Sequence, residues 1–444
     1  MKIWEKGTEV DAAIEKFTVG KDRELDILLA PFDVLGSIAH VTMLESIGLI
    51  KQEELPVLLN SLKRIYRKTL QPGFVIEQSV EDIHSQIELM LTRELGDTGK
   101  KIHSGRSRND QVLVDLKLFM RSELEQIVNQ TASLADLLLE MSETHKKILM
   151  PGYTHLQVAM PSSFGLWFGA YAESLIDDID QLYAAWKMVN RNPLGSAAGY
   201  GSSFPLNRTM TTQLLGFESL HYNSVYAQMG RGKTERIVAS AMANLAATLS
   251  KLAYDVCLFM SQNFAFVSLP DSLTTGSSIM PHKKNPDVFE LIRGNANKLQ
   301  GLPSQITLIA NNLPSGYFRD MQAMKEIILP AFSELQNILG ITTYAVRHIA
   351  VNQDILSDKR YQHLFSVEEV NRLTLEGIPF RDAYRKVGES IANNSFTANH
   401  NLNHTHEGSI GNLCLDQIAE RKTTVLKQFD FEAVQAALDN LVSA

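Results

Sequence analysis

Apolar residues recur at helical spacing through most of the chain. In the segment 108–143 they fall on every fourth position, at Val112, Leu116, Met120, Leu124 and Val128. Side chains four residues apart share one face of a helix, so this pattern predicts an amphipathic helix that buries one side. Alternating stretches bounded by turn residues are scarce, and only 14 prolines interrupt the chain. The pattern therefore predicts an all-α protein.

Other segments show the same periodicity. Shorter helices are predicted within 22–50, after Glu53 and after Asp82, and long helices over 162–190, 230–262 and 286–312. The long ones exceed the mean helix length of about 12 residues. Within the second, the run IVASAMANLAATLS at 237–250 carries no charge and many small residues. A helix that is apolar on every side is buried, so we expect this one in the middle of a bundle.

Two helix starts carry the spacing of a capping box, in which a Ser and an acidic side chain three residues later bond each other's backbone amides. Ser107 and Asp110 have this spacing at the start of the long helix over 108–143. Ser79 and Asp82 have it before an apolar stripe that begins at Ile83. The sequence therefore predicts that Ser107 and Ser79 precede helices.

The helices fall into three predicted domains. Residues 1–105 form a modest N-terminal helical domain, residues 106–352 carry the long helices of a central bundle, and residues 353–444 show shorter helices and polar loops. Neither a low-complexity segment nor a convincing internal repeat is visible. The predicted fold is all-α, with three helical domains around a long central helix bundle.

Composition narrows the function classes. Apolar residues make up 44% of the chain and charged residues 21%, which is typical of a globular protein. A net charge of −8 argues against a nucleic-acid partner, because no general excess of cations exists to neutralise phosphates. Neither a signal peptide nor an uncharged apolar run of about 18 residues is apparent, so we expect no membrane association. The two cysteines, Cys257 and Cys414, form no disulfide framework, and we expect a cytoplasmic protein.

The stretch 274–290, TTGSSIMPHKKNPDVFE, concentrates candidate chemistry. Gly276 permits a mobile loop that carries Ser277, and Lys283 follows with a second lysine beside it. Asn285 and the proline after it are suited to opening a helix, whose first amides lack partners. Hydroxyls, ammonium groups and free amides together form a place where an anion can bind. A surface loop before a helix is the plainer interpretation of such a composition.

Histidines give a second set of candidates. In the stretch 150–161, MPGYTHLQVAMP, Thr154 and His155 lie between two proline-containing breaks. A lone histidine is more often a hydrogen-bonded structural residue than a catalyst. The cluster of His400, His404 and His406 suggests a metal site, but no carboxylate or cysteine in the local sequence completes a ligand set. The Asn-rich surroundings favour a loop there, with no metal.

Three stretches together resemble a known family. The string GSSIMPHKKNPD resembles the signature loop of the fumarase/aspartase superfamily, whose pattern is GSSxMPxKxNP. HSGRSRNDQ and GYTHLQ resemble two further signatures, those of argininosuccinate lyases, and the first of them is specific to that branch. Shorter matches such as EDIH at 81–84 and NPLGS at 192–196 extend the resemblance over most of the chain.

The resemblance implies reversible β-elimination, in which argininosuccinate is cleaved to L-arginine and fumarate. Ser277 matches the base that removes the carbon proton, and Lys283 and Asn285 match groups that stabilise the carbanion. His155, paired with Glu290, matches the group that helps to protonate the departing guanidino nitrogen. Which group finally donates that proton stays open.

Binding roles are implied in the same way. Ser107, Arg108 and Asn109 match residues that hold the succinyl carboxylates, and Thr154 resembles another carboxylate contact. The positions that match contacts to the rest of the substrate are Tyr317, Gln322, Lys325 and, near the arginine end, Asp22. The family assembles as a homotetramer whose central helices form one core, and the same is expected here. No metal, nucleotide or prosthetic group is implied.

The chain departs from the family pattern at several positions. Thr18 replaces the usual Ser, His282 replaces Gln in the loop, Phe318 replaces Asn, and the N-terminus shows only IWEKG at 3–7. These changes affect fine substrate contacts and leave the elimination residues intact. Two alternatives stay open at this point. One is a superfamily lyase that acts on another succinyl or fumarate-forming substrate, and the other is a structural protein that kept the fold but lost activity.

Overall fold

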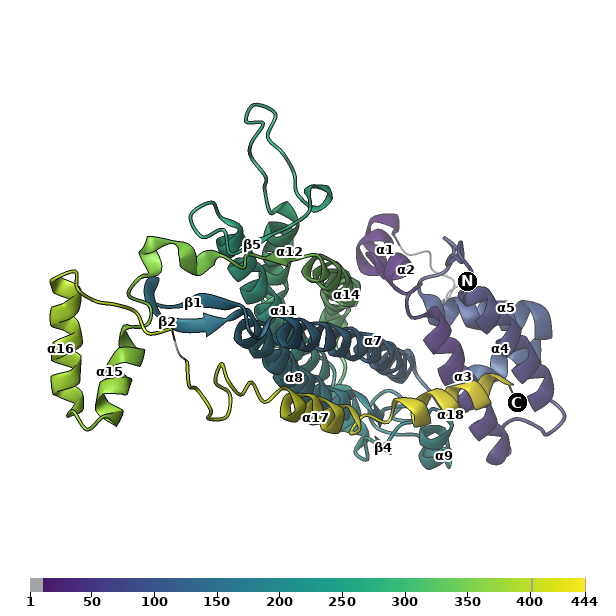
Figure 1. The fold of residues 1–444 in the computed structure, drawn as a ribbon. Coiled ribbons are helices and arrows are strands. Elements are labelled where there is room, and N and C mark those ends of the chain that lie inside the picture. The colour runs from purple at the N-terminus through teal and green to yellow at the C-terminus, as the bar shows by residue number, and fades with distance from the viewer. Residues whose placement is uncertain (1–10, 401, 444) are drawn as a thin grey trace.

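Helices are the dominant secondary structure in the computed structural model, which describes residues 11–400 and 402–443. The predicted all-α class is confirmed, because the strands of the described ranges form only two-stranded sheets. Figure 1 shows an elongated molecule, with an N-terminal helical region at one end, long helices in the middle and a small helical hairpin at the other end. A long loop projects sideways from the middle.

The central bundle consists of long helices that run side by side. Its members are α7 (Arg108–His145), α8 (Phe164–Val189), α11 (Lys233–Met260), α12 (Asp287–Leu299), α13 (Leu302–Ala310) and α14 (Lys325–Arg347). Helix α7 packs mainly on α8 and α14, and α11 packs on α8, α12 and α13. Their inward faces form one continuous apolar core that includes Leu124, Phe168, Leu245 and Phe332. Burial of this core is the main driving force for the arrangement.

The start of α7 agrees with the predicted capping box. The hydroxyl of Ser107 accepts a hydrogen bond from the Asn109 amide at 3.3 Å, and the Ser107 amide donates to Asp110 Oδ1 at 2.8 Å. A helix leaves its first amides without partners, and these contacts satisfy two of them locally. Because the pairing needs only neighbours in sequence, it was visible without tertiary information.

The predicted helix over 286–312 is wrong in one respect, because it is two helices. Helix α12 ends at Leu299 and α13 begins at Leu302, with Gly301 between them. Pro303 lies in the first turn of α13, where its missing N–H costs nothing. In a continuous helix Pro303 would leave the Leu299 carbonyl without its N–H partner, so the helix breaks just before the proline.

Helix α11 is buried on most of its surface, in agreement with its uncharged apolar run. A stripe at Asn244, Ala247, Lys251 and Tyr254 is nevertheless exposed in the single chain. Among the described helices, α11 is the one unbroken helix long and apolar enough to span a membrane by length and composition. Since most of that window is packed inside the bundle, α11 is the core helix of this domain.

The N-terminal region has its own apolar core. It contains α1 (Ala12–Val19), α2 (Asp22–Leu25), α3 (Ala30–Ser46), α4 (Leu55–Thr69), α5 (Ile83–Leu95) and α6 (Asp97–Lys100). The capping box predicted at Ser79 is wrong, because Asp82 itself precedes α5 and accepts from the Ser85 amide at 2.8 Å. A carboxylate is as good a cap as a hydroxyl, so the helix starts at the residue after the acid.

The segment after residue 352 is divided among three places. Helices α15 (Ser366–Leu375) and α16 (Phe380–Ala392) form a hairpin with a small core of its own. Helix α17 (Leu415–Leu426) packs on α8, and α18 (Phe431–Ser443) crosses to α3 and α9 (Arg208–Leu214). The C-terminal helix thus lies beside the N-terminal region (Figure 1). The domain limits at 105 and 352 stay a prediction.

Short elements complete the fold. Helix α10 (Ser224–Met229) precedes α11, and the strands are β1 (Leu149–Thr154), β2 (Gln157–Ser163), β3 (Arg191–Asn192), β4 (Ser219–Leu220), β5 (Val267–Ser268) and β6 (Ala350–Val351). β1 and β2 form an antiparallel hairpin directly after α7. The pairs β3–β4 and β5–β6 are two residues long and fasten loops to the bundle.

Candidate active site

A polar cavity of about 150 Å³ lies where the N-terminal region meets the start of α7. Its lining comes from α2, from α5 and the residues before it, from α7, from the turn before α11 and from the start of α14 with the segment before it. These residues are Asp22, Glu81, Asp82, His84, Arg108, Asn109, Val112, Arg231, Tyr317, Arg319, Gln322 and Lys325. Five of these side chains are cationic or titrate to a cation, and three are acidic. Such a mixture suits a ligand that carries charges of both signs.

One side of the cavity is the N-terminus of α7. Arg108 Nη1 lies 3.0 Å from Glu81 Oε2 and 3.2 Å from Asp82 Oδ2, and Nη2 donates to Ser85 Oγ at 2.6 Å. These contacts fix the guanidinium beside Asn109, at a helix end whose partial charge is positive. Arg319 Nη2 also lies 3.4 Å from Glu81 Oε1, so two guanidinium groups balance the two carboxylates here. An anionic group that enters meets a positioned arginine, an amide side chain and the helix dipole.

Asp110 holds the loop over 195–197 against this helix end. Its Oδ2 accepts from the Gly195 and Ala197 amides, both at 2.9 Å, while Oδ1 accepts from Ser107. Burial raises the pKa of Asp110 to about 6, and the amide hydrogen bonds oppose the shift only in part. The position of Ser107 therefore depends on a carboxyl group that is itself buried.

Another part of the cavity lining is a buried ion-pair cluster. Lys325 Nζ donates to Asp26 Oδ1 at 2.6 Å and to Asp22 Oδ1 at 3.2 Å. Burial alone would lower the pKa of Lys325, but Asp26 and Asp22 outweigh it and raise that pKa. Two carboxylates facing one ammonium leave an excess negative charge, which favours a cationic group of a ligand.

The remaining lining residues connect α1 to the bundle. Arg319 Nη2 and Gln322 Nε2 both donate to the Thr18 carbonyl, at 2.8 and 3.0 Å. The Thr18 hydroxyl donates to the Ile14 carbonyl of its own helix at 2.9 Å, so the Thr-for-Ser departure places no hydroxyl in the cavity. The guanidinium of Arg231 lies over the Tyr317 ring, 5.8 Å from its centre. The IWEKG departure at 3–7 lies outside the described residues.

Thr154 and His155 lie elsewhere, at the tip of the β1–β2 hairpin. Thr154 pairs with Gln157, so His155 and Leu156 are the two residues of the turn, with φ of 54° and 55°. Both are in the left-handed region, where Asn and Gly are the usual residues. Such a position costs about 1–3 kcal/mol for other residues, and it presents His155 to solvent.

The loop predicted to be catalytic projects from the bundle above α12 (Figure 1). Its base is closed by an antiparallel bridge between Thr275 and Asn285, while Lys283 and Ile279 are exposed near its end. Ser277 Oγ accepts from the Met280 amide at 3.2 Å. Lys284 is paired with Asp271, whereas Lys283 has no partner among the described residues. His282 is exposed on the same loop.

Comparisons with known proteins agree on one family. A family model described as lyase matches residues 5–301. The chain is 64% identical to an argininosuccinate lyase of Bacteroides fragilis and 63% identical to one of Parabacteroides distasonis, each over 99% of both chains. The chain belongs to the argininosuccinate lyase family. It is accordingly a carbon–nitrogen lyase by family.

The fold is shared more widely than the sequence. A solved structure of an EDDS lyase variant with bound fumarate covers 98% of this chain and 94% of its own, with a TM-score of 0.79 at 22% identity. At this identity the likeness concerns the fold alone. Membership in the argininosuccinate lyase family is shown by the full-length relatives above.

Six of the family residues predicted from sequence line the one cavity: Asp22, Arg108, Asn109, Tyr317, Gln322 and Lys325. The structure does not bring the others to it within the chain. Ser107 caps the helix beside it, whereas Thr154 and His155 are on the hairpin and Ser277, Lys283, Asn285 and Glu290 on the projecting loop and α12. The predicted pair of His155 with Glu290 is not made within the described chain.

The length of α7 explains this separation. The helix has 38 residues, which at 1.5 Å per residue span about 57 Å. Arg108 is at its first turn and the hairpin with His155 follows its last turn, so the same helix holds the two residues apart. One chain cannot place both around one small molecule.

Sequence reasoning gave no role to five residues of the cavity: Glu81, Asp82, His84, Arg231 and Arg319. The EDIH string contains the first three and was a usable signal. Arg231, only 4% exposed, leaves Nε and Nη1 without a hydrogen-bond partner in the described chain, although Nε lies 3.9 Å from Glu235 Oε1. No local pattern distinguished it, because its place depends on the Met321 carbonyl, to which Nη2 donates at 3.0 Å. Of the three histidines near residue 400, His404 contacts Glu368, with its Nε2 2.9 Å from Oε1.

Proposed function

We propose that this protein catalyses the reversible cleavage of argininosuccinate into L-arginine and fumarate, the last step of arginine biosynthesis. The observation that supports it most strongly is the grouping of six family residues around one cavity, in a chain 63–64% identical to argininosuccinate lyases. The cavity is charged at both ends, as a substrate with a succinyl end and an arginine end requires.

In the proposed complex the succinyl carboxylates lie at the N-terminus of α7. Arg108 and Asn109 donate to them, Ser107 positions the helix end, and Thr154 supplies a further contact. Asp22 faces the cationic arginine end, where the excess of carboxylates over Lys325 favours it. Tyr317 and Gln322 hold the rest of the substrate. Opposite charges at the two ends fix its direction in the site.

The proposed chemistry is carried by the projecting loop. Ser277 removes the proton from the carbon next to a succinyl carboxylate, and the carbanion that forms passes its charge into that carboxylate. Lys283 and Asn285 stabilise this charge as a cation and an amide donor. Lys283 is the suitable lysine, since Lys284 is occupied by Asp271. Closure of the exposed loop over the substrate would also exclude water.

The bond to the guanidino nitrogen then breaks, and the nitrogen receives a proton. His155, oriented by Glu290, is proposed for this part of the reaction. The turn that carries His155 holds it at an exposed tip, where it can reach a substrate held by other elements. This arrangement requires that His155 and Glu290 meet in the assembled protein, because they do not meet within one chain.

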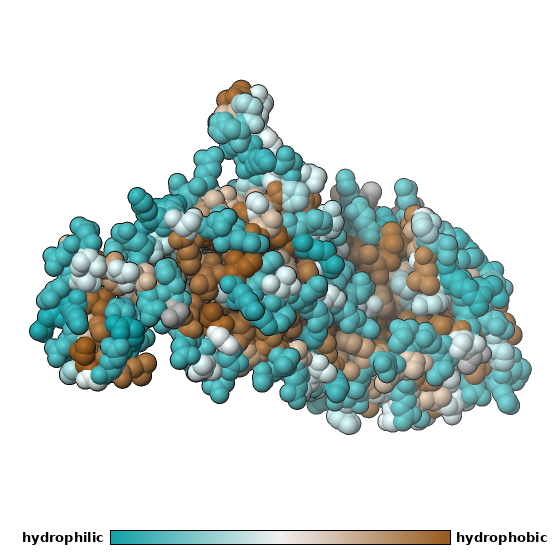
Figure 2. All heavy atoms as spheres, viewed as in Figure 1, coloured by the Kyte–Doolittle hydropathy of each residue, from teal (hydrophilic) through white to brown (hydrophobic). Residues whose placement is uncertain are grey.

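The proposed assembly is a homotetramer in which each site takes its three stretches from three subunits. In a closed oligomer, one chain's hairpin can approach another chain's cavity although its own is about 57 Å of helix away. The exposed side chains that provide apolar area for the central contacts are those of Tyr254 on α11 and of Leu291, Leu308 and Tyr344. Figure 2 shows apolar atoms gathered over the middle of the bundle.

A cytoplasmic location is part of the same proposal. Cys257 and Cys414 are both free thiols, which fits a reducing compartment. We propose no cofactor or metal for the reaction, since charge stabilisation by fixed cations and proton transfer by side chains account for each step.

The test is to offer argininosuccinate, adenylosuccinate, aspartate and malate separately and to follow fumarate by its ultraviolet absorbance. Argininosuccinate alone is expected to give fumarate. Fumarate from another of these substrates would favour the alternative superfamily lyase. Absence of fumarate from all of them, in a protein that is folded and assembled, would favour a structural protein.

A further inference from the structure

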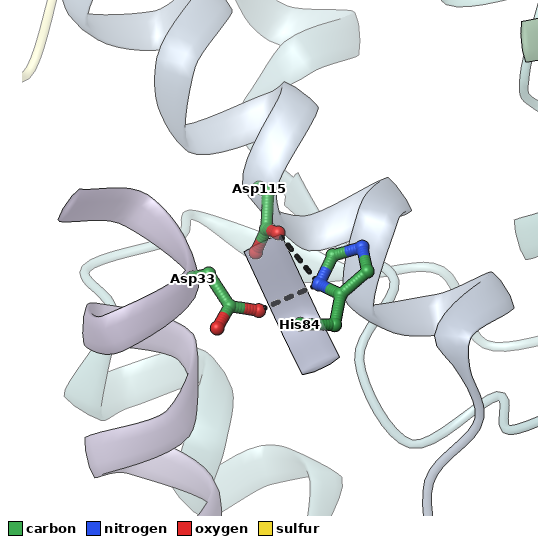
Figure 3. A group of neighbouring side chains, drawn as sticks. All are labelled: Asp33, His84 and Asp115. Atoms are coloured by element: carbon green, nitrogen blue, oxygen red, sulfur yellow. Dashed lines mark hydrogen bonds and ion pairs between the residues drawn. The ribbon is translucent and has the colours of Figure 1, made fainter. Parts of the chain in front are cut away.

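A buried histidine with two carboxylates lies at the wall of the cavity, formed by His84 of α5, Asp33 of α3 and Asp115 of α7 (Figure 3). His84 Nδ1 lies 2.8 Å from Asp33 Oδ1 and 3.4 Å from Asp115 Oδ2. The three side chains are 6%, 2% and 1% exposed. None of them was given a role by the family motifs.

The geometry determines how the imidazole is used. Both carboxylates approach the same nitrogen, so Nδ1 carries a proton and donates to Asp33, as in other carboxylate–histidine pairs. The ring is thereby turned so that Nε2 points away from the two acids (Figure 3). No described protein group bonds Nε2, and His84 lines the cavity with Arg108 and Asn109.

The surrounding charges favour the doubly protonated ring. The charges of Asp26, Asp33 and Asp82 act on His84, whereas burial and the charge of Asp33 raise the pKa of Asp115 well above its usual value. The other titratable groups around the cluster are Glu88 on the acidic side and His103, Arg106 and Arg108 on the basic side. Burial alone would lower the pKa of His84, but the hydrogen bond to Asp33 and the charges of Asp33 and Asp82 outweigh it and raise that pKa. In that state Nε2 bears a proton too.

We propose that His84 binds the substrate directly, as an imidazolium whose Nε2–H donates to a carboxylate of the succinyl group held by Arg108 and Asn109. This inference rests on the proposed function, since it concerns the same substrate. Asp33 and Asp115 are positioning residues, which act through His84. Helix α7 connects the parts, because Arg108, Val112 and Asp115 share one face at positions i, i+4 and i+7.

A divalent metal is the competing explanation of the cluster. The three ligand atoms lie within 4.8 Å of one another, and both oxygens of Asp115 and Oδ2 of Asp33 have no hydrogen-bond partner in the described chain. A metal would have to displace the 2.8 Å contact between Nδ1 and Asp33. It would also lie near the buried guanidinium of Arg106, whose charge acts on Asp115. A proton on Nδ1 keeps the contact with Asp33 and places no metal cation beside Arg106.

The experiment measures fumarate binding to the intact protein by calorimetry between pH 6 and 9. One series contains a chelator, which removes metal ions, and a second series contains added Zn²⁺ in place of the chelator. Wild-type affinity is expected to fall as pH rises above the raised pKa of His84, that is, above 6.5. His84→Asn keeps a donor for Asp33 but not the one at Nε2, and its affinity at low pH should fall at least about tenfold, or about 1.4 kcal/mol.

Two further variants separate binding from folding. His84→Gln keeps a neutral donor toward the cavity, so it should bind better than His84→Asn but lose the pH dependence. Asp33→Asn leaves the cavity lining unchanged and should move the fall in affinity to lower pH, because Asp33 raises the pKa of His84, and a purely structural role would not do this. His406→Asn, in an exposed loop, is the matched control and should behave as wild type.

The outcomes are distinct. Unchanged fumarate affinity in both His84 variants, at every pH, would overturn the role of His84 while the proposed reaction stands. Zn²⁺ binding that is lost in Asp33→Asn would overturn it in favour of the metal. Failure of the wild type to cleave argininosuccinate, with a His84-dependent fumarate affinity, would instead count against the proposed reaction.

Discussion

Thr275 and Asn285 face each other across the base of the projecting loop, and each donates its amide to the other's carbonyl, at 3.3 and 2.8 Å. The Asn285 side chain also donates to Thr275 Oγ1 at 3.3 Å, and that hydroxyl donates to Asp287. Thr275 thus orients the amide proposed to stabilise the carbanion, and it does so from the start of the loop.

Thr275→Val should slow turnover without unfolding the protein. The change removes the hydroxyl and keeps the shape, so Asn285 loses its side-chain partner. We expect a fall in kcat of about tenfold to a hundredfold, below the 10²–10³ typical of losing a stabilising donor itself. Thr274→Val is the matched control, because its hydroxyl bonds only the Asp271 carbonyl. Equal kcat in both variants would remove Thr275 from the argument.

Ser277→Ala should abolish turnover and leave thermal melting nearly unchanged. Ser277 bonds only amides of its own loop, and substitutions at such positions shift stability by less than about 0.5 kcal/mol. Steady-state turnover and a melting curve on the same preparation check both parts. A variant with near-normal turnover would exclude Ser277 as the base.

The loop over 276–284 should become protected when fumarate binds. Its base is bridged but its outer part is exposed, and the exposed ammonium of Lys283, unlike that of Lys284, has no carboxylate partner in the described chain and can bind an anion. Hydrogen exchange of these amides should therefore slow with ligand, while exchange in α16, far along the molecule, should not change. Equal protection with and without fumarate would indicate a rigid, preformed loop.

Sharing of sites between chains predicts rescue between two inactive variants. His155→Ala and Ser277→Ala chains, mixed equally, should restore activity, because each site would draw the two residues from different chains. In an equal mixture, half of the sites receive an intact His155 and, independently, half receive an intact Ser277. About a quarter of the sites should therefore be complete in the mixed closed oligomer. Turnover after co-expression measures this. Mixed tetramers without regained activity would show that each site belongs to a single chain.

Asp110 should give the stability a specific pH dependence. Burial raises its pKa from 3.8 to about 6. Between about pH 4 and 6, Asp110 is therefore protonated in the folded protein and ionised in the unfolded chain. Stability from this group is therefore present at low pH and decreases as pH rises from about 4 to 6, by roughly 3 kcal/mol at most at 1.36 kcal/mol per pKa unit. The free energy of unfolding of wild type and Asp110→Asn, measured with denaturant across this pH range, isolates the contribution of Asp110. The free energy of unfolding of the wild type should decrease more steeply with pH. Parallel curves would contradict it.

What could be predicted from sequence depended on the range of the interaction. The cap of α7 was predictable because Ser107 and Asp110 need only each other. The break after α12 was missed although Pro303 was visible, because apolar periodicity continues on both sides of it. The turn at His155 had no Asn or Gly to mark it, and only the pairing of β1 with β2 forces the left-handed backbone.

The site itself divides in the same way. The family motifs indicated residues one by one, and the structure brings Asp22 and Lys325 into contact across the chain. Periodicity could not show that meeting, because the contact joins distant segments. It also could not show that His84 lies between Asp33 and Asp115, since three helices must pack before the ring has its two acids.

The return of α18 to the N-terminal region has a consequence for synthesis. Leu441 belongs to the same apolar core as Ile38 and Leu62, so α3 and α4 lack part of their cover until the last helix has been made. At about 5–20 residues per second, some 395 residues between α3 and Leu441 take roughly 20–80 s to translate. During that time the nascent N-terminal region, still on the ribosome, exposes the apolar surface that α18 later covers. A chaperone can bind to such a surface.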